Sequence, residues 1–150
     1  MMSDWSLFLA IATFSLAAAA FWVIWQNYNF RREDRKSKSL NEIRDWAREG
    51  LNLVTRIHRL PTTNANFPPV WEVIACLSYI ESQRHILLKY VERLKSDNLK
   101  NVVSCALGNV KNCLDSYKQA EAMNIRLDNA RKCENTFVDV LNEASRITKL

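Results

Sequence analysis

The chain has 150 residues and a net charge of +5, a length that sets the expectation of one domain. It contains only two glycines and three prolines, so the many tight turns of a sandwich, barrel or propeller are excluded and long helices remain. It has no glycine-rich phosphate loop, nucleophile elbow, HExxH or CxxC motif. We therefore predict an all-α protein with no catalytic, cofactor or metal-binding residues.

The first element is an apolar run from Trp5 to Trp25, whose polar members are three hydroxyl residues. As a helix it would be about 32 Å long, enough to cross a hydrocarbon core of roughly 30 Å. Aromatic side chains, which favour the headgroup level of a bilayer, stand at both ends: Trp5 at the start, and Trp22, Trp25 and Tyr28 at the other end. The run predicts a single-pass transmembrane anchor in residues 1–30.

A basic juxtamembrane segment, residues 31–38, follows the run. Its cations are Arg31, Arg32, Arg35, Lys36 and Lys38. The other flank carries Asp4 and no Lys or Arg, which argues against a cleaved signal peptide. The positive-inside rule then places the N-terminus outside and residues 39–150 in the cytoplasm. These cations are interpreted as the topology signal, with a site for anionic lipids as the alternative, and no nucleic-acid partner is expected.

A second helix is expected to begin near residue 40. Residues Ser39 to Glu42 have the capping-box form, a hydroxyl at the helix start with a glutamate three residues later. Helical structure should persist from the anchor through residues 31–36, because Arg, Glu and Lys are good helix formers, and then bend or restart at residues 37–39. This helix should end by Leu60, and the proline-bearing segment 61–69 reads as a loop.

Three more stretches have helical apolar spacing: residues 70–95, interrupted at Arg84, residues 99–120 and residues 127–147. Apolar residues spaced seven apart, a pattern typical of a coiled coil, continue across residues 121–126 in the same phase. One long helix over 99–150 therefore stays an alternative. We favour a turn at 122–126, with Asn124 as a left-handed stop. The cytoplasmic part, residues 39–150, is then an antiparallel four-helix bundle.

Few residues suggest chemistry. Arg84 interrupts an apolar stripe and is a candidate buried polar site, because a buried arginine requires an anionic partner. The four cysteines have no metal-ligand spacing and are interpreted as small buried hydrophobes. Glu81 and His85 share a helix face, but one such pair is not a di-iron motif. Trp46 and Trp71 are interpreted as core residues, and exposure of either would indicate an interface.

Two functions are consistent with these features. The first is a non-enzymatic protein anchored in the lipid bilayer, whose helical bundle serves as an interaction or scaffold module at the cytoplasmic face. Its partner would be another protein or a second copy in a homo-oligomer. The alternative is a membrane-bound enzyme or ligand-binding bundle with a pocket between helices. An exposed tryptophan favours the first, and a buried Arg84 in a hollow favours the second.

Overall fold

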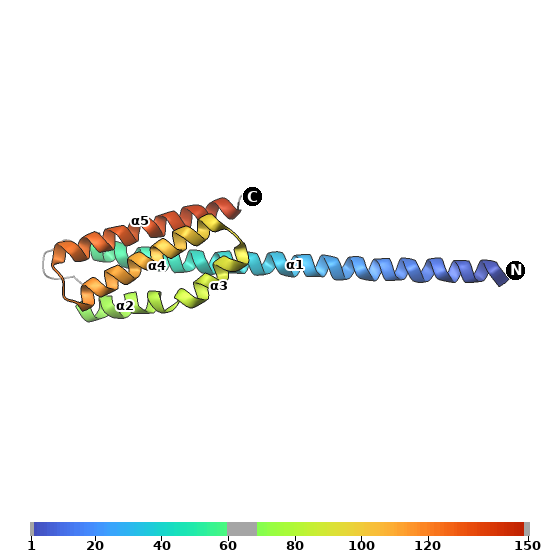
Figure 1. Ribbon diagram of the computed structural model, residues 1–150, viewed down its shortest axis with the longest axis horizontal. Coiled ribbons are helices and arrows are strands. Elements are labelled where there is room, and N and C mark those ends of the chain that lie inside the picture. The colour runs from blue at the N-terminus through green and yellow to red at the C-terminus, as the bar shows by residue number, and fades with distance from the viewer. Residues whose placement is uncertain (1, 60–68, 149–150) are drawn as a thin grey trace. The chain divides into compact units, whose positions relative to one another are not determined.

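The computed structural model describes the backbone of residues 2–59 and 69–148 and the side chains of residues 12–57 and 69–148. This part of the chain consists of helices and connecting turns, with no strand, which confirms the all-α class (Figure 1). The chain divides into two compact units, Met1–Ser37 and Lys38–Leu150.

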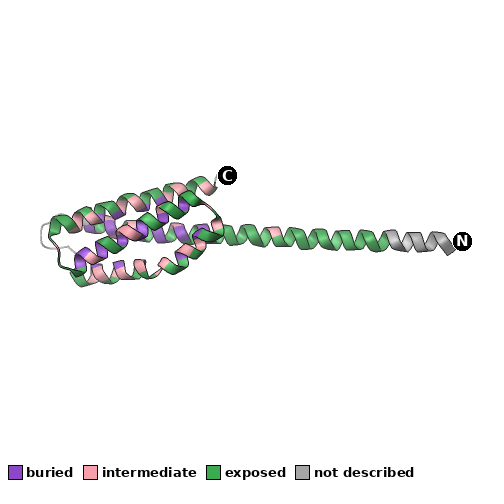
Figure 2. Cartoon of the chain, viewed as in Figure 1, coloured by how far each residue is buried: buried purple, intermediate pink, exposed green. Residues whose placement is uncertain are grey.

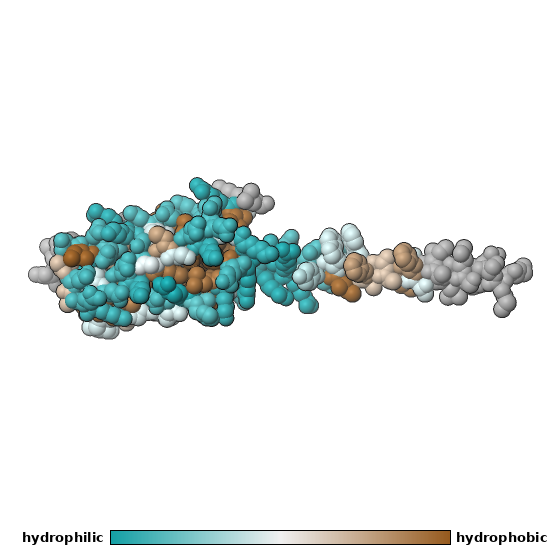
Figure 3. All heavy atoms as spheres, in the orientation of Figure 1, coloured by the Kyte–Doolittle hydropathy of each residue, from teal (hydrophilic) through white to brown (hydrophobic). Residues whose placement is uncertain are grey.

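The first unit is helical and lies within the long helix α1, Met2–Arg59. Its described side chains, from residue 12 onward, are exposed except for the half-buried Asn29, and Figure 2 shows this as green with one pink segment. Apolar side chains are included, since Phe14 is 76% exposed and Phe21 72%. Figure 3 shows their apolar surface next to the undescribed residues. The described residues of this unit therefore leave these apolar side chains uncovered.

No helix in the described part of the chain is long and apolar enough to cross a membrane. The side chains of residues 1–11, which include the start of the apolar run, lie outside that part. Trp5 is among them, so its predicted place at a membrane interface lies outside the described residues.

The second unit is a helical bundle, as the apolar spacing predicted. It is built from the last part of α1, α2 (Val70–Ser82), α3 (Arg84–Leu94), α4 (Asp97–Lys118) and α5 (Met123–Thr148). Helices α2 and α3 follow one another in the same direction along one side of the bundle. Counting this pair as one, each helix of the bundle runs opposite to the one before it (Figure 1). The core takes apolar residues from every helix, including Ile43, Leu77, Leu107 and Phe137.

The helix start predicted at Ser39 is wrong. Helix α1 runs without interruption through residues 37–39, so Ser39 occupies a helix interior rather than a cap. Its side chain is buried, and its hydroxyl has no hydrogen-bond partner among the described residues. The good helix formers of residues 31–36 continue directly into the amphipathic segment that follows, so the capping-box pattern does not start a helix here.

The stretch at 70–95 is two helices, not one. Gln83 ends α2 and precedes α3, with its N–H directed to the carbonyl of Glu81. Helix α3 ends at Lys95 in the left-handed conformation (φ 53°), and the Ser96 hydroxyl then caps α4 by accepting from Leu99 N at 3.3 Å. The break lies next to Arg84, where the apolar stripe was interrupted in the sequence.

Residues 99–148 form two helices, and their turn lies earlier than predicted. Helix α4 ends at Lys118 and α5 begins at Met123, so Asn124 lies inside a helix. The left-handed residue is Ala120, with φ 52°. The Glu121 N–H bonds the Ser116 carbonyl at 3.1 Å, a six-to-one closure of the helix end. This non-glycine residue costs on the order of 1 kcal/mol there, offset by the packing of α4 on α5.

Candidate functional site

The residues predicted at the membrane interface are exposed wherever their side chains are described. Trp22, Trp25 and Tyr28 are 58%, 49% and 66% exposed, and the Trp22 and Trp25 rings lie 5.3 Å apart. The basic residues are also exposed: Arg31, Arg32, Arg35, Lys36 and Lys38. Both groups are thus available to a surface outside the unit.

Arg84 is half exposed rather than fully buried. Its Nε donates to Glu81 Oε1 at 3.0 Å, and its Nη2 donates to the Leu107 carbonyl at 3.3 Å. The exposed fractions of the Arg84 and Glu81 side chains are 40% and 32%, so water still reaches both charges. Arg84 ties the break between α2 and α3 to α4, and it lines neither of the hollows described below. Its geometry gives the inter-helix pocket hypothesis no support.

The cysteines fall into two classes. Cys113 on α4 and Cys133 on α5 are fully buried, as expected of small hydrophobes, and their thiols are hydrogen-bonded to each other. That hydrogen bond, together with burial, raises the pKa of the Cys133 thiol, so it stays protonated. Cys105 was expected to be buried but is exposed, and it lines a hollow of about 190 Å³ with Thr136 and Asp139. Cys76 is half buried.

No group of three or more His, Cys, Asp or Glu residues that could hold a metal ion occurs within the described residues. Glu81 lies on α2 and is the carboxylate paired with Arg84, whereas His85 lies on α3, so the break at Gln83 separates the two residues that were expected to share a helix face. His85 itself is exposed. The contact between Arg84 and Glu81 is thus an ordinary surface ion pair.

The two bundle tryptophans behave differently. Trp46 is buried, its Nε1–H donates to the Ile80 carbonyl at 3.3 Å, and its ring meets Phe137 edge-on with centroids 5.1 Å apart. Trp71 on α2 is 71% exposed, contrary to the core role expected of it. A large exposed aromatic side chain on a folded surface is typical of an interface.

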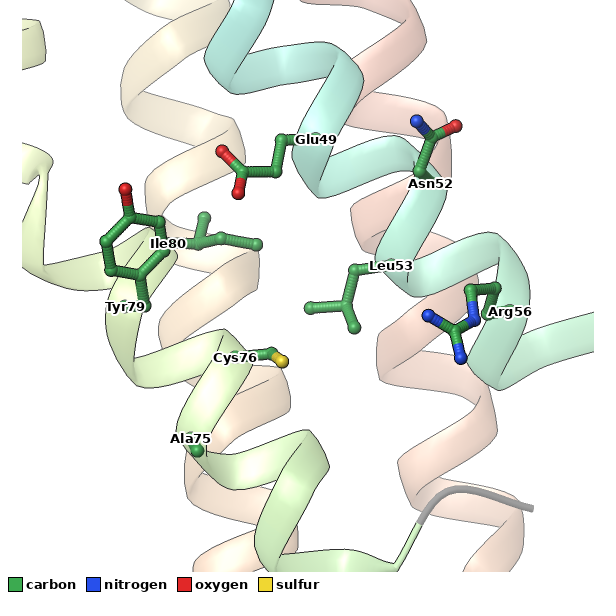
Figure 4. A pocket seen from close by; sticks show the side chains of 8 residues that line it. All are labelled: Glu49, Asn52, Leu53, Arg56, Ala75, Cys76, Tyr79 and Ile80. Carbon is green, nitrogen blue, oxygen red and sulfur yellow. The ribbon is translucent and has the colours of Figure 1, made fainter. Parts of the chain in front are cut away.

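A hollow of about 460 Å³ lies between α1 and α2, on the side of α2 that carries Ala75 and Tyr79. Figure 4 shows Leu53 of α1 and Cys76 of α2 directed into the gap between the two helices. The lining residues are Glu49, Asn52, Leu53 and Arg56 of α1 and Ala75, Cys76, Tyr79 and Ile80 of α2. Its floor is apolar, and its charged members, Glu49 and Arg56, are exposed.

Sequence reasoning named Trp71 as a residue whose exposure would indicate an interface, but it did not recognise the rest of this surface. Trp71, Ala75 and Tyr79 recur every four residues on α2, outside the stripe that supplies the buried Val73, Leu77 and Ile80. A set of apolar residues out of phase with the core stripe was the available signal. It was not recognised because exposed single apolar residues are common.

No protein-family model, curated protein or solved structure matches this chain. No relative's residue roles can therefore be carried over to the hollow or to the basic segment. What these residues do is inferred from their exposure, charge and packing.

Proposed function

We propose that the chain is a single-pass membrane-anchored helical protein whose bundle is a protein-interaction or scaffold module at the cytoplasmic face. The N-terminus then lies outside. The observation that carries the proposal is the exposure of an apolar helix: residues 12–28 hold aromatic and aliphatic side chains that nothing described in the unit buries, such as Phe21 and Ile24. Burying them in hydrocarbon stabilises the protein by roughly 25 cal/mol per Å².

The anchor requires the apolar run as a whole, from Trp5 to Trp25. Its described portion falls short of a membrane span, and the apolar residues before position 12 supply the remainder. Two aromatic residues at the far end, Trp22 and Trp25, are exposed as headgroup-level residues would need to be. The exposed cations of residues 31–38 support the cytoplasmic assignment of the bundle.

The interaction role is supported by the second unit. It buries its own core, including Ile43 and Phe137, and yet leaves Trp71 and Tyr79 exposed beside an apolar hollow. A bundle that needed these aromatics only for folding would bury them. Aromatic side chains on a hollowed surface are the usual centres of protein–protein binding energy.

The second candidate function is a ligand-binding bundle or membrane-bound enzyme, and the volume of the α1/α2 hollow is the observation that favours it, because small-molecule sites are of that size. Its charged lining residues, Glu49 and Arg56, are exposed. A catalytic pair is normally desolvated so that its pKa values move toward neutrality. The interaction role therefore fits the hollow better.

The anchor is tested by extraction of native membranes with alkaline carbonate. The full chain is expected to stay in the membrane pellet and to leave it only with detergent. The variant Phe14→Lys/Leu16→Lys places two charges near the middle of the run, each costing about 2.5 to 3.5 kcal/mol at a helix centre, and should move the protein to the supernatant. The matched variant Lys111→Gln/Lys118→Gln should pellet like the parent. Release of the parent chain by carbonate alone would refute the anchor.

A further inference from the structure

The surface around the hollow is called the α1/α2 face. It comprises Glu49, Asn52, Leu53 and Arg56 of α1 and Trp71, Ala75, Cys76 and Tyr79 of α2. Trp71 belongs to it because residues four apart share one side of a helix, and Ala75 and Tyr79 both line the hollow.

The α1 side of this face carries opposite charges at its two ends. Glu49 and Arg56 are seven residues apart, which is two helical turns or about 10 Å. Both are exposed, and neither forms an ion pair with another residue of the described chain. Between them lie the uncharged Asn52 and Leu53, as Figure 4 shows.

The α2 side has large residues at its ends and a small one in the middle. Trp71 and Tyr79 are 71% and 55% exposed, and Ala75 lies halfway between them. The two aromatic rings are eight residues apart, about 12 Å along the helix. A small central residue allows a second helix to approach closely, while the aromatic residues at either end supply apolar contact area.

Both patterns suit a twofold axis that crosses the two helices at right angles. Such an axis turns each helix end for end, so Glu49 of one copy meets Arg56 of the other, and Trp71 of one meets Tyr79 of the other. The midpoints, near Leu53 and near Ala75, both line the same hollow, so a single axis passes close to both. A twofold axis parallel to the helices would instead place α1 of one copy on α2 of the other, and it would pair neither Glu49 with Arg56 nor Trp71 with Tyr79.

We propose that the α1/α2 face is the docking surface for a second copy of this chain, arranged antiparallel about a twofold axis through Leu53 and Ala75. The buried aromatic area of Trp71 and Tyr79 supplies the affinity, and the two symmetry-related Glu49–Arg56 pairs set the register and direction. This names the partner of the interaction module proposed above and rests on that half of the proposal, not on the anchor. Because α1 of one copy is antiparallel to α1 of the other, their Lys38 ends lie at opposite ends of the dimer, so two anchored copies are held in two facing membranes rather than side by side in one.

The test is the self-association of the full chain in mild detergent, measured by sedimentation velocity over a range of protein concentrations. The parent chain should dimerise reversibly. Glu49→Arg and Arg56→Glu, each alone, should weaken the dimer about tenfold, because each replaces two attractive pairs by two like-charged ones. The double variant Glu49→Arg/Arg56→Glu re-creates both pairs and should return to within about twofold of the parent.

The apolar part of the face is tested by Trp71→Ala and Tyr79→Ala, each of which should weaken the dimer tenfold or more. Their controls are Lys111→Glu and Val138→Ala, exposed residues of α4 and α5 outside the face, which should change nothing. All of these variants replace exposed side chains, and matching thermal unfolding of each will show that the bundle is intact.

Three results would overturn the inference. A parent chain that stays monomeric at every concentration excludes the dimer. A dimer that no face variant weakens associates elsewhere, which leaves the interaction function standing but removes this face from it. If the single variants weaken the dimer and the double variant stays equally weak, the face meets a different surface, as a foreign helix or another site on the chain would require.

Discussion

The ring of Phe137 on α5 lies against the backbone of Gly50 on α1 with no room for a side chain between them. A Cβ atom at Gly50 would fall under 3.0 Å from the ring. Phe137 is itself buried against Trp46, which is held by its hydrogen bond to Ile80. Helices α1 and α5 therefore approach closely at this point, and the contact depends on glycine.

Gly50→Ala should consequently destabilise the bundle by about 1 to 3 kcal/mol through overpacking. The matched control is Gly108→Ala in α4, where an added Cβ meets nothing within 4 Å. There the gain in helix propensity should stabilise the protein by about 0.5 to 1 kcal/mol. Chemical unfolding followed by circular dichroism measures both changes, and equal effects of the two substitutions would contradict the close approach at Gly50.

Two serines with opposite roles give a second prediction. The buried Ser39 hydroxyl has no partner in the described chain, so Ser39→Ala should leave stability unchanged or raise it by about 1 kcal/mol. Ser96 caps α4 through Leu99 N, so Ser96→Ala should cost about 1 kcal/mol. The free energy of unfolding of each variant is the readout. If Ser39→Ala lowered the free energy of unfolding as much as Ser96→Ala does, Ser39 would act as a helix cap after all, contrary to the continuous helix.

Tyr117 predicts a stability change in alkaline solution. Burial, with a smaller contribution from the Cys113 thiol, raises the pKa of Tyr117 to about 12, although Arg126 over its ring opposes the rise. The folded state thus holds the phenol proton more tightly than the unfolded state. Stability from this group is complete below the unfolded pKa near 10 and is lost as the pH rises through about 12.

Tyr117→Phe isolates that contribution, because other side chains titrate in the same range. The free energies of unfolding of parent and variant are compared at pH 8 to 11. The variant's free energy of unfolding should exceed that of the parent by an amount that grows with pH above 10. The phenol oxygen has no partner in the described chain, so the variant should also be at least as stable as the parent at neutral pH. Parallel pH profiles would contradict the raised pKa.

The sequence predicted the bundle because apolar spacing reports which face of a helix is buried, and residues such as Ile43, Val54 and Phe137 are fully buried as their stripes required. It failed where tertiary packing outweighed local preference. The left-handed Ala120 costs on the order of 1 kcal/mol, and Gln83 breaks the helix in an ordinary right-handed conformation. Neither position therefore carries a proline or glycine that would mark it in the sequence.

The candidate surface was harder to predict than the core. Exposure of Trp71 and Tyr79 depends on how α1 and α2 are rotated in the bundle, and helical spacing fixes that rotation only to within about one residue. The juxtamembrane cations, by contrast, could be identified directly, because topology depends on composition near the apolar run rather than on packing.

The basic residues offer a test of the cause of orientation. Replacing Arg31, Arg32, Arg35, Lys36 and Lys38 together with glutamine should weaken or invert the orientation of the chain. Glutamine at Lys111 and Lys118 in α4 should not, since both lie far from the apolar run in sequence. The fraction of molecules in each orientation is scored with a glycosylation acceptor fused ahead of Met1, and equal effects from the two sets would remove the positive-inside rule as the cause.

Protease protection distinguishes a chain anchored by its apolar run, with the bundle in the cytoplasm, from every other placement of the bundle. A tag is placed after Leu150 and cells are treated with protease before and after permeabilisation of the membrane. We expect the tag to pellet with membranes, to be protected in intact cells and to be digested once the cells are permeabilised. Digestion of the tag in intact cells would show that the bundle lies outside, and its recovery in the membrane-free fraction would show that the chain is not anchored.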